Sequence, residues 1–165
     1  MSKRGFTLIE LTIVLFLIGT MLFFAVPRIR DVVLTDDLKK TANLLNTTAR
    51  QLRSDAVRNQ VDYVISLDLD HNLLYTFSTD MTPEALQEVK NRPYKLPGQV
   101  KFVDVYQFGE DKITTGEVRI TFFRKGYTVP AVIHLARGDD FMTLVVSPFL
   151  PDIKTYDKYL DFDYI

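Results

Sequence analysis

A long apolar segment near the N-terminus constrains this chain more than any other feature. Within residues 6–26 the residues that are not apolar are Thr7, Glu10, Thr12, Gly19 and Thr20. As an α-helix, a segment of this length extends about 31 Å, which matches the hydrocarbon core of a bilayer. Lys3 and Arg4 precede it. We therefore expect the N-terminus to stay in the cytoplasm and the rest of the chain to be exported.

Two common kinds of apolar N-terminal segment explain this one poorly. A cleaved secretory signal has a shorter apolar region followed by a small-residue site such as Ala-x-Ala. This segment is longer, and Ala25-Val26-Pro27 at its end is not such a site. An ordinary membrane anchor explains the length and the basic flank, but it leaves Glu10 unexplained. A carboxylate inside a membrane span is expensive and usually has a partner or a function.

A short motif surrounds this carboxylate. Residues 3–10 read Lys-Arg-Gly-Phe-Thr-Leu-Ile-Glu, and Gly19 and Pro27 follow in the apolar segment. The motif resembles the N-terminal signal of type IV prepilins and of type II secretion pseudopilins. Those signals consist of a short basic leader ending in glycine, a phenylalanine, a Thr-Leu-Ile-Glu run and an apolar helix. The resemblance covers some 22 residues.

The resemblance implies a two-step maturation. A membrane-embedded prepilin peptidase would cleave between Gly5 and Phe6 and then methylate the new amine of Phe6. Cleavage removes the two basic residues and creates an ammonium close to Glu10. In the family this glutamate meets the N-terminal ammonium of a neighbouring subunit. Much of that attraction offsets desolvation, so we expect Glu10 to set the register of assembly rather than to add net stability.

Gly19 and Pro27 are weak points of the predicted helix. Glycine costs about 1 kcal/mol relative to alanine in a helix, and an interior proline about 3 kcal/mol. Pro27 has no amide hydrogen to donate to the carbonyl of Phe23. Two interpretations stay open. One is a kink where the helix leaves the membrane, and the other, implied by the resemblance, is a stretch that unwinds when subunits pack.

The remaining residues predict a head built on the same helix. From residue 28 to about 60 one apolar stripe recurs at alternating spacings of four and three. Its members are Leu38, Ala42, Leu45, Ala49, Leu52 and Ala56. The period then changes to two, and strands are expected at 61–69, 73–78, 99–106, 117–124, 129–136 and 141–147. Thr82 and Pro83 predict the start of a short helix that ends near Lys90.

This pattern predicts an α+β, pilin-like fold in which the long N-terminal helix packs on an antiparallel sheet. We expect three segments: a cleaved leader at 1–5, a helix for the membrane and the filament core at 6–27, and a periplasmic head at 28–165. The glycine-bounded strand at 116–126 and the helix end at 53–60 resemble the GspH/FimT-like group of minor pseudopilins and pilins.

Other chemistry finds little support in the sequence. The chain has no cysteine, and its 20 basic and 21 acidic residues are balanced. His71 and His134 lie in no catalytic motif, and there is no phosphate-binding glycine loop. Asp68, Asp70 and Asn72 have alternating spacing, but the glycine and the distal glutamate of a calcium loop are missing. We predict no enzymatic activity, no cofactor and no metal site.

Two surface features leave alternatives open. Residues 158–165 alternate apolar and acidic side chains, which predicts either a final edge strand of the sheet or a docking strand for a neighbouring subunit.

A second set of residues could form a basic patch that binds DNA, although a solvated face is the simpler interpretation. These residues are Arg119, Arg124, Lys125 and Arg137. Because the charges are balanced overall, we do not predict a nucleic-acid partner.

The function implied by the resemblance is structural. The chain is expected to be a minor pseudopilin of a type II secretion system, in or at the tip of a periplasmic pseudopilus that supports protein export. The alternative is a FimT-like minor type IV pilin that primes pilus assembly or helps DNA uptake. The expected partners are other pilin subunits, the prepilin peptidase and N-methyltransferase, the inner-membrane assembly platform and membrane lipid. The expected location is the inner membrane, crossed once, with the head in the periplasm.

Overall fold

The structure, a computed structural model, describes residues 8–161, and for residues 24–36 it describes the backbone without the side chains. The contacts divide the chain into two units, with the boundary between Thr35 and Asp36. Gly5 and Phe6 lie outside the described residues, as does the end of the C-terminal segment at 162–165. The two units are described separately below.

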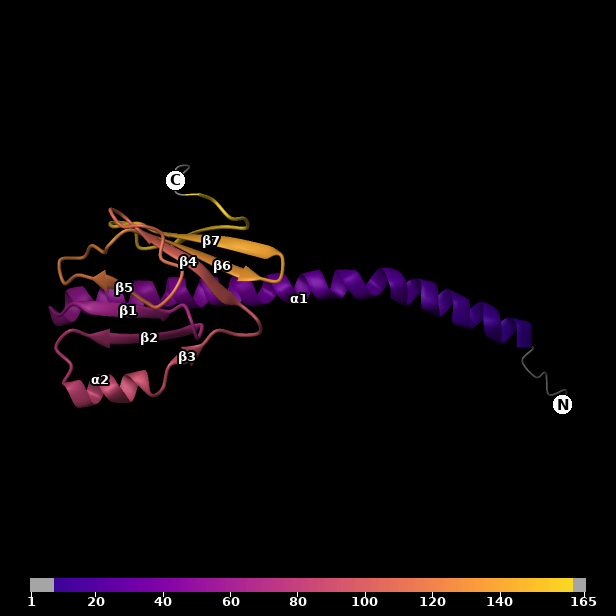
Figure 1. Cartoon of the computed structure of the whole chain (residues 1–165), viewed down its shortest axis with the longest axis horizontal. Helices are drawn as coiled ribbons and strands as arrows, with labels where there is room; N and C mark the ends of the chain where they lie inside the picture. Colours follow the sequence, from indigo (N-terminus) through magenta and orange to yellow (C-terminus); the bar gives the residue numbers. More distant parts are fainter. Residues whose placement is uncertain (1–7, 162–165) are drawn as a thin grey trace. The chain divides into compact units, whose positions relative to one another are not determined.

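The elements confirm the α+β class (Figure 1). In chain order they are α1 (Leu8–Asn59), β1 (Tyr63–Asp68), β2 (Leu73–Ser78), α2 (Pro83–Lys90), β3 (Tyr94–Lys95), β4 (Lys101–Gln107), β5 (Glu117–Phe122), β6 (Ala131–Arg137), β7 (Asp140–Val146) and β8 (Lys154–Tyr156). The short helix begins as predicted, because the Thr82 side chain accepts a hydrogen bond from the amide of Ala85 at 3.3 Å. Two short strands, β3 and β8, were not predicted.

In the second unit, α1 carries the predicted stripe on its buried face. Each of its six leucines and alanines is at most 6% exposed. Alanine alternates with leucine along the stripe, so small side chains leave room for the larger ones of the strands. Thr41 is also buried, and its hydroxyl donates to the carbonyl of Asp37 at 2.9 Å. This hydrogen bond satisfies a hydroxyl that would otherwise be buried without a partner.

The strands form two sheets where the sequence predicted one. The first sheet has the order β3-β2-β1-β5, and the second has the order β4-β6-β7-β8. All pairs are antiparallel, and β5 lies against β1 with Ile65 opposite Ile120. Residue alternation shows which side chains of a strand are buried, but it does not show which strand lies beside it. The division into two sheets therefore could not be read from the periodicity.

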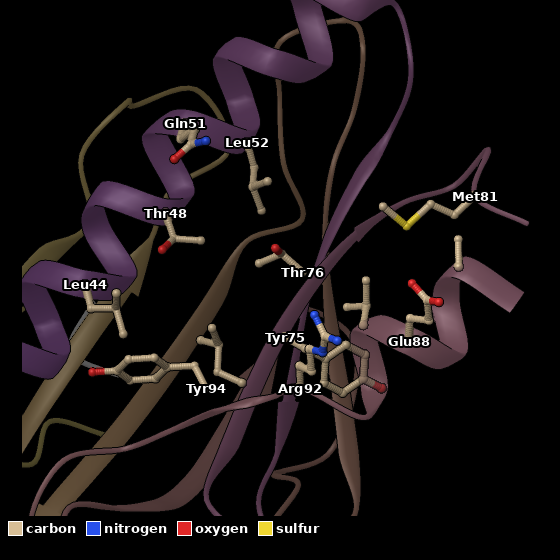
Figure 2. A pocket seen from close by; sticks show the side chains of 13 residues that line it. Leu44, Thr48, Gln51, Leu52, Tyr75, Thr76, Met81, Glu88, Arg92 and Tyr94 are labelled. Atoms are coloured by element: carbon tan, nitrogen blue, oxygen red, sulfur yellow. The ribbon is translucent and has the colours of Figure 1, made fainter. Parts of the chain in front are cut away.

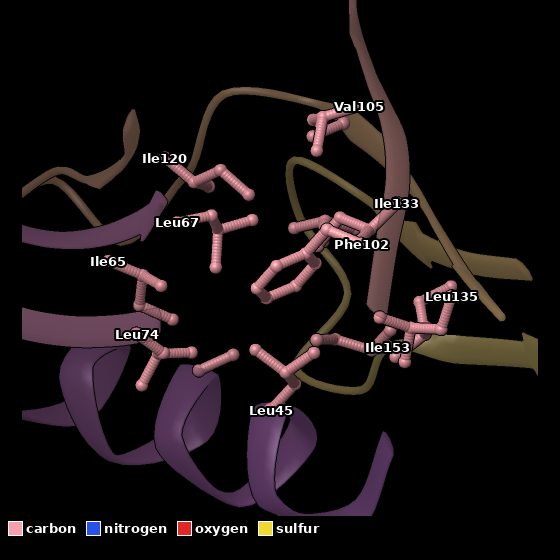
Figure 3. Packing of buried hydrophobic residues seen from close by; sticks show 14 of the residues in the cluster. Leu45, Ile65, Leu67, Leu74, Phe102, Val105, Ile120, Ile133, Leu135 and Ile153 are labelled. Carbon is pink, nitrogen blue, oxygen red and sulfur yellow. The ribbon is translucent and has the colours of Figure 1, made fainter. Parts of the chain in front are cut away.

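Both sheets share one hydrophobic core against α1 (Figure 3). Leu45 rises from the helix, Leu67 and Ile120 come from the first sheet, and Phe102 and Ile133 come from the second. All five are at most 5% exposed. Because the same helix face covers the inner side of both sheets, the stripe on α1 is the element that joins them.

The turn between β1 and β2 links the two sheets through polar side chains. The Asp70 carboxylate accepts a hydrogen bond from the amide of Gly116 at 3.1 Å, at the start of β5. The Asn72 side chain accepts one from the amide of Phe102 at 2.8 Å, in β4. Among the described residues, no three side chains of the kind that bind metals gather in one place. The alternating Asp and Asn residues that hint at a calcium loop therefore serve as backbone acceptors.

An ion pair fastens α1 to the end of β6, beside the loop before β4. Arg137, at the end of β6, pairs with Asp37, and their side chains are only 12% and 16% exposed. Gly98 lies against this pair with a backbone φ of +61°. A Cβ at position 98 would lie 2.5 Å from a carboxylate oxygen of Asp37 and 3.3 Å from the Arg137 guanidinium carbon. Glycine is required here by both the conformation and the space.

Replacing Gly98 with alanine should destabilise the head more than the same change at Gly138. Both residues have nearly the same φ, +61° and +60°, but a Cβ at Gly138 would meet nothing within 4 Å. The left-handed conformation costs each variant about 1–2 kcal/mol. Gly98→Ala should lose about 1 kcal/mol more, because Asp37 must move away from Arg137. Urea unfolding followed by circular dichroism measures both variants, and equal losses would show that the ion pair adds nothing at this site.

Candidate functional site

The first unit presents a helix that is apolar on every side. Between Leu8 and Phe23 of α1 the large apolar side chains are all exposed, and the least exposed is Val14 at 40%. Residues 13–18 are six consecutive examples. Because successive residues of an α-helix turn by about 100°, they cover the whole circumference. A helix with this surface is buried in a larger environment, made either of lipid or of other helices.

The polar groups of this segment are largely satisfied within the helix. The Thr12 hydroxyl donates to the carbonyl of Ile9 at 2.8 Å, and the Thr20 hydroxyl donates to that of Phe16 at 2.7 Å. Such bonds let threonine enter apolar surroundings without an outside partner. Glu10 is the charged residue of the segment 8–23, and it lies in the first turn of α1. Over the residues that the structure describes, no helix combines the length and hydropathy of a membrane span.

The predicted weak points do not interrupt α1. The helix continues through Gly19 and Pro27. A Cβ at Gly19 would meet nothing within 4 Å, so packing within this chain gives no reason for a glycine there. The side chain of Pro27 is not described. A kink and an unwinding segment both remain predictions for these two residues.

The four residues of the suggested basic patch lie in three separate places. Arg119 is on β5, where its Nε lies 2.7 Å from a carboxylate oxygen of Glu117. Burial favours the protonated acid, but hydrogen bonding, chiefly from Arg119, lowers the pKa of Glu117 to about 2. Arg124 and Lys125 are in the turn after β5. Arg137 lies in the other sheet, paired with Asp37. The structure does not gather these cations into one patch.

A shallow groove lies between α1, β2 and α2 (Figure 2). Its lining combines apolar side chains such as Leu44 and Met81 with polar ones such as Gln51, Glu88 and Arg92. Figure 2 shows the α1 residues on one wall and the α2 residues on the other. The groove brings together no set of residues typical of a catalytic site.

The C-terminal segment differs from its predicted form. The edge strand is β8 at Lys154–Tyr156, and the described residues that follow it, 157–161, form no strand. They lie instead on the outer face of the second sheet, where the Leu160 amide donates to the Thr143 hydroxyl at 3.0 Å. The prediction of an edge strand at 158–165 is therefore wrong for residues 158–161. Their hydrogen bonds go to side chains rather than to a neighbouring strand.

A row of buried polar side chains lies under this segment, and sequence reasoning missed it. Asp104, His134 and Thr143 stand opposite one another on β4, β6 and β7. They are at most 3% exposed. His134, which lies in no catalytic motif, is packed in the interior. The available signal was that each polar residue interrupts an otherwise apolar strand.

The N-terminal residues match a known family description. Residues 1–26 match the one entitled "Prokaryotic N-terminal methylation motif". The match covers the predicted cleavage position, Glu10 and Gly19. No curated protein sequence matches the chain.

Two solved structures share the fold. Both are of the minor pseudopilin EpsH from the type II secretion system of Vibrio cholerae, with TM-scores of 0.52 and 0.53. Each is 11% identical to this chain and covers 76% of it, and the matches span 99% and 97% of the EpsH chains. The chain therefore combines a prepilin-type N-terminal motif with a fold found in a minor pseudopilin.

Removing residues 1–35 should remove the tendency to associate through the exposed helix. The remaining residues, 36–165, contain the ion pair and the core described above. We expect the truncated chain to be a monomer in buffer without detergent, whereas the complete chain needs detergent to stay dispersed. Size-exclusion chromatography with light scattering measures both. Association of the truncated chain would place an additional apolar contact surface on the head.

Proposed function

We propose that the chain is a minor pseudopilin of a type II secretion system. In this proposal it is a structural subunit that joins other pilin-like subunits in a short periplasmic filament, or at its tip, and so supports protein export. The observation that carries the proposal is the fully apolar, exposed helix with one carboxylate in its first turn, which overlaps a methylation motif.

The helix suits two successive environments. Before assembly, the N-terminal half of α1 would anchor the chain in the inner membrane as a single span, with the head in the periplasm. After assembly, the same surface would contact the helices of neighbouring subunits. The internal hydrogen bonds of Thr12 and Thr20 serve in both environments, since neither hydroxyl needs water.

Glu10 is the residue that distinguishes the two environments. A carboxylate is costly in lipid, and a partner of opposite charge reduces that cost. Cleavage after Gly5 would supply such a partner as the methylated ammonium of Phe6 on a neighbouring subunit. This pairing would favour one axial position of the subunit over others, which is a role in register.

The alternative is a FimT-like minor type IV pilin, since the N-terminal motif serves both machines. The DNA-uptake version of this alternative requires clustered cations. Arg119 and Arg137 each have an acidic partner, and the candidates are spread over both sheets. The fold likeness to a secretion pseudopilin favours the first proposal. Co-purification of the assembled chain with its neighbouring subunits identifies the machine.

Co-expression with a prepilin peptidase tests the proposed maturation. The intact mass of the product should correspond to residues 6–165 with one added methyl group. Gly5→Leu should block cleavage, because the peptidase must approach the backbone closely. Gly19→Ala is the matched control and should be processed normally, since a Cβ there meets no neighbour. A product that keeps residues 1–5 in the presence of active peptidase would contradict the proposal.

The variant Glu10→Gln should be processed but should assemble poorly. The amide keeps the shape and removes the charge that would pair with the ammonium. We expect incorporation into filaments, measured by crosslinking, to fall about tenfold or more, which corresponds to roughly 1.4 kcal/mol. Glu84→Gln, on the exposed first turn of α2, is the control and should assemble normally. Normal incorporation of the Glu10 variant would remove the register role from this residue.

A further inference from the structure

The segment 157–161, here called the C-terminal strap, crosses the outer face of the second sheet. The hydrogen bonds described between the strap and that face involve side chains. The Thr143 hydroxyl donates to the carbonyl of Lys158 at 2.7 Å and accepts from the amide of Leu160 at 3.0 Å. The Nε2 atom of His134 lies 2.9 Å from the carbonyl oxygen of Leu160. Ladder pairing of β8 with β7 ends at Tyr156, before the strap begins.

The Tyr159 side chain adds further contacts between the strap and the second sheet. Its ring stacks on the imidazole of His134 with centroids 3.9 Å apart. Its hydroxyl donates to Asp104 at 3.1 Å and accepts from the Lys112 ammonium at 2.6 Å. Lys112 also lies 3.4 Å from the carboxylate of Asp161. The strap is therefore attached at three strands and at the loop after β4.

The core of the head does not include the strap. The shared hydrophobic cluster draws on α1, both sheets and Ile153, and none of its members belongs to residues 157–161. Tyr159 and Leu160 are only half-buried, and the other three residues of the strap are exposed. Detachment of the strap would therefore leave the core packed, while it would give water access to the buried row of Asp104, His134 and Thr143.

His134 connects the strap to the buried row. Its Nδ1 atom lies 2.6 Å from a carboxylate oxygen of Asp104, and its Nε2 atom faces the carbonyl of Leu160. The imidazole therefore bridges β4 and the strap through its two ring nitrogens. Because these contacts are polar and no strap residue belongs to the hydrophobic core, they can break without loss of core packing.

Charged and polar groups surround the imidazole. Asp104 faces it from β4, Tyr159 and Asp161 belong to the strap, and Lys112 approaches from the loop after β4. Burial alone would raise the pKa of Asp104, but hydrogen bonds from His134 and Tyr159 and nearby positive charge lower it. The carboxylate form of Asp104, which accepts hydrogen bonds from both side chains, is therefore favoured.

We propose that residues 157–161 form a releasable strap, held on the second sheet by polar contacts with Asp104, His134 and Thr143, that detaches while the head stays folded and uncovers the face formed by these three residues. Its release turns a closed face of the head into an accessible one, and this needs no rearrangement of the two sheets.

Hydrogen exchange at the Leu160 amide, resolved by residue in the complete chain in detergent micelles, tests the proposal. The protection factor, corrected for the intrinsic rate, should be at least about tenfold lower than that of the Ile133 amide, in the core strand β6. Equal protection at both amides would overturn the proposal, because the strap would then be an integral part of the fold.

Two variants with matched controls separate the strap from general stability. His134→Phe keeps an aromatic ring against Tyr159 but removes both polar bonds, so the protection of the Leu160 amide should fall further below that of the Ile133 amide. His71→Phe, at an exposed histidine in the β1–β2 turn, should behave as the unmodified chain.

If His134→Phe does not fold, Thr143→Val tests the attachment, since it removes only the two hydrogen bonds of the hydroxyl. Thr41→Val changes a buried threonine that bonds only within α1 and is its control. Unchanged Leu160 protection in Thr143→Val would contradict the proposed attachment.

Discussion

The burial of one stripe of α1 under both sheets is the interaction on which the head depends. Leucine and alanine alternate along this stripe, and the inner faces of the two sheets meet over it. Over residues 8–161 each sheet has four strands, and neither closes on itself. Without the helix, each would expose an apolar face to water. The helix that is proposed to enter the filament core is thus also the centre of the head, so the two parts of the molecule share one continuous element.

Polar side chains fix the loops around this core. Asp70 and Asn72 in one turn accept backbone amides from β5 and β4, and Asp37 holds Arg137 beside Gly98. These hydrogen bonds and ion pairs are directional, whereas the apolar attraction that holds the core together is not. They also explain why residues that hint at a metal loop, or at a DNA-binding patch, have other partners. Charged and amide groups that look available in a sequence are often needed by the backbone of the same chain.

The first half of α1 has the opposite character. Its apolar side chains are exposed on all sides, and its threonines bond within the helix. It therefore contributes nothing to the core of the head, and its purpose lies in what surrounds it. The head, by contrast, carries a polar row beneath its C-terminal strap, where attachment depends on hydrogen bonds rather than on buried apolar area. The two units therefore depend on different interactions, and they are expected to respond to different changes in their surroundings.

Local sequence patterns were enough to predict the apolar helix, the Leu and Ala stripe, the cap at Thr82 and most of the strands, because each depends on local periodicity or on one side chain beside its own backbone. The sequence also carried the N-terminal motif, whose residues are contiguous. Three other features could be seen only in the folded chain: the strands divide into two sheets, Arg137 pairs with Asp37, and residues 158–161 form a strap instead of a strand. These outcomes depend on partners distant in the chain. Asp104, His134, Thr143 and Tyr159 come from four separate segments, and only the register of three strands and the path of the C-terminal segment bring them together.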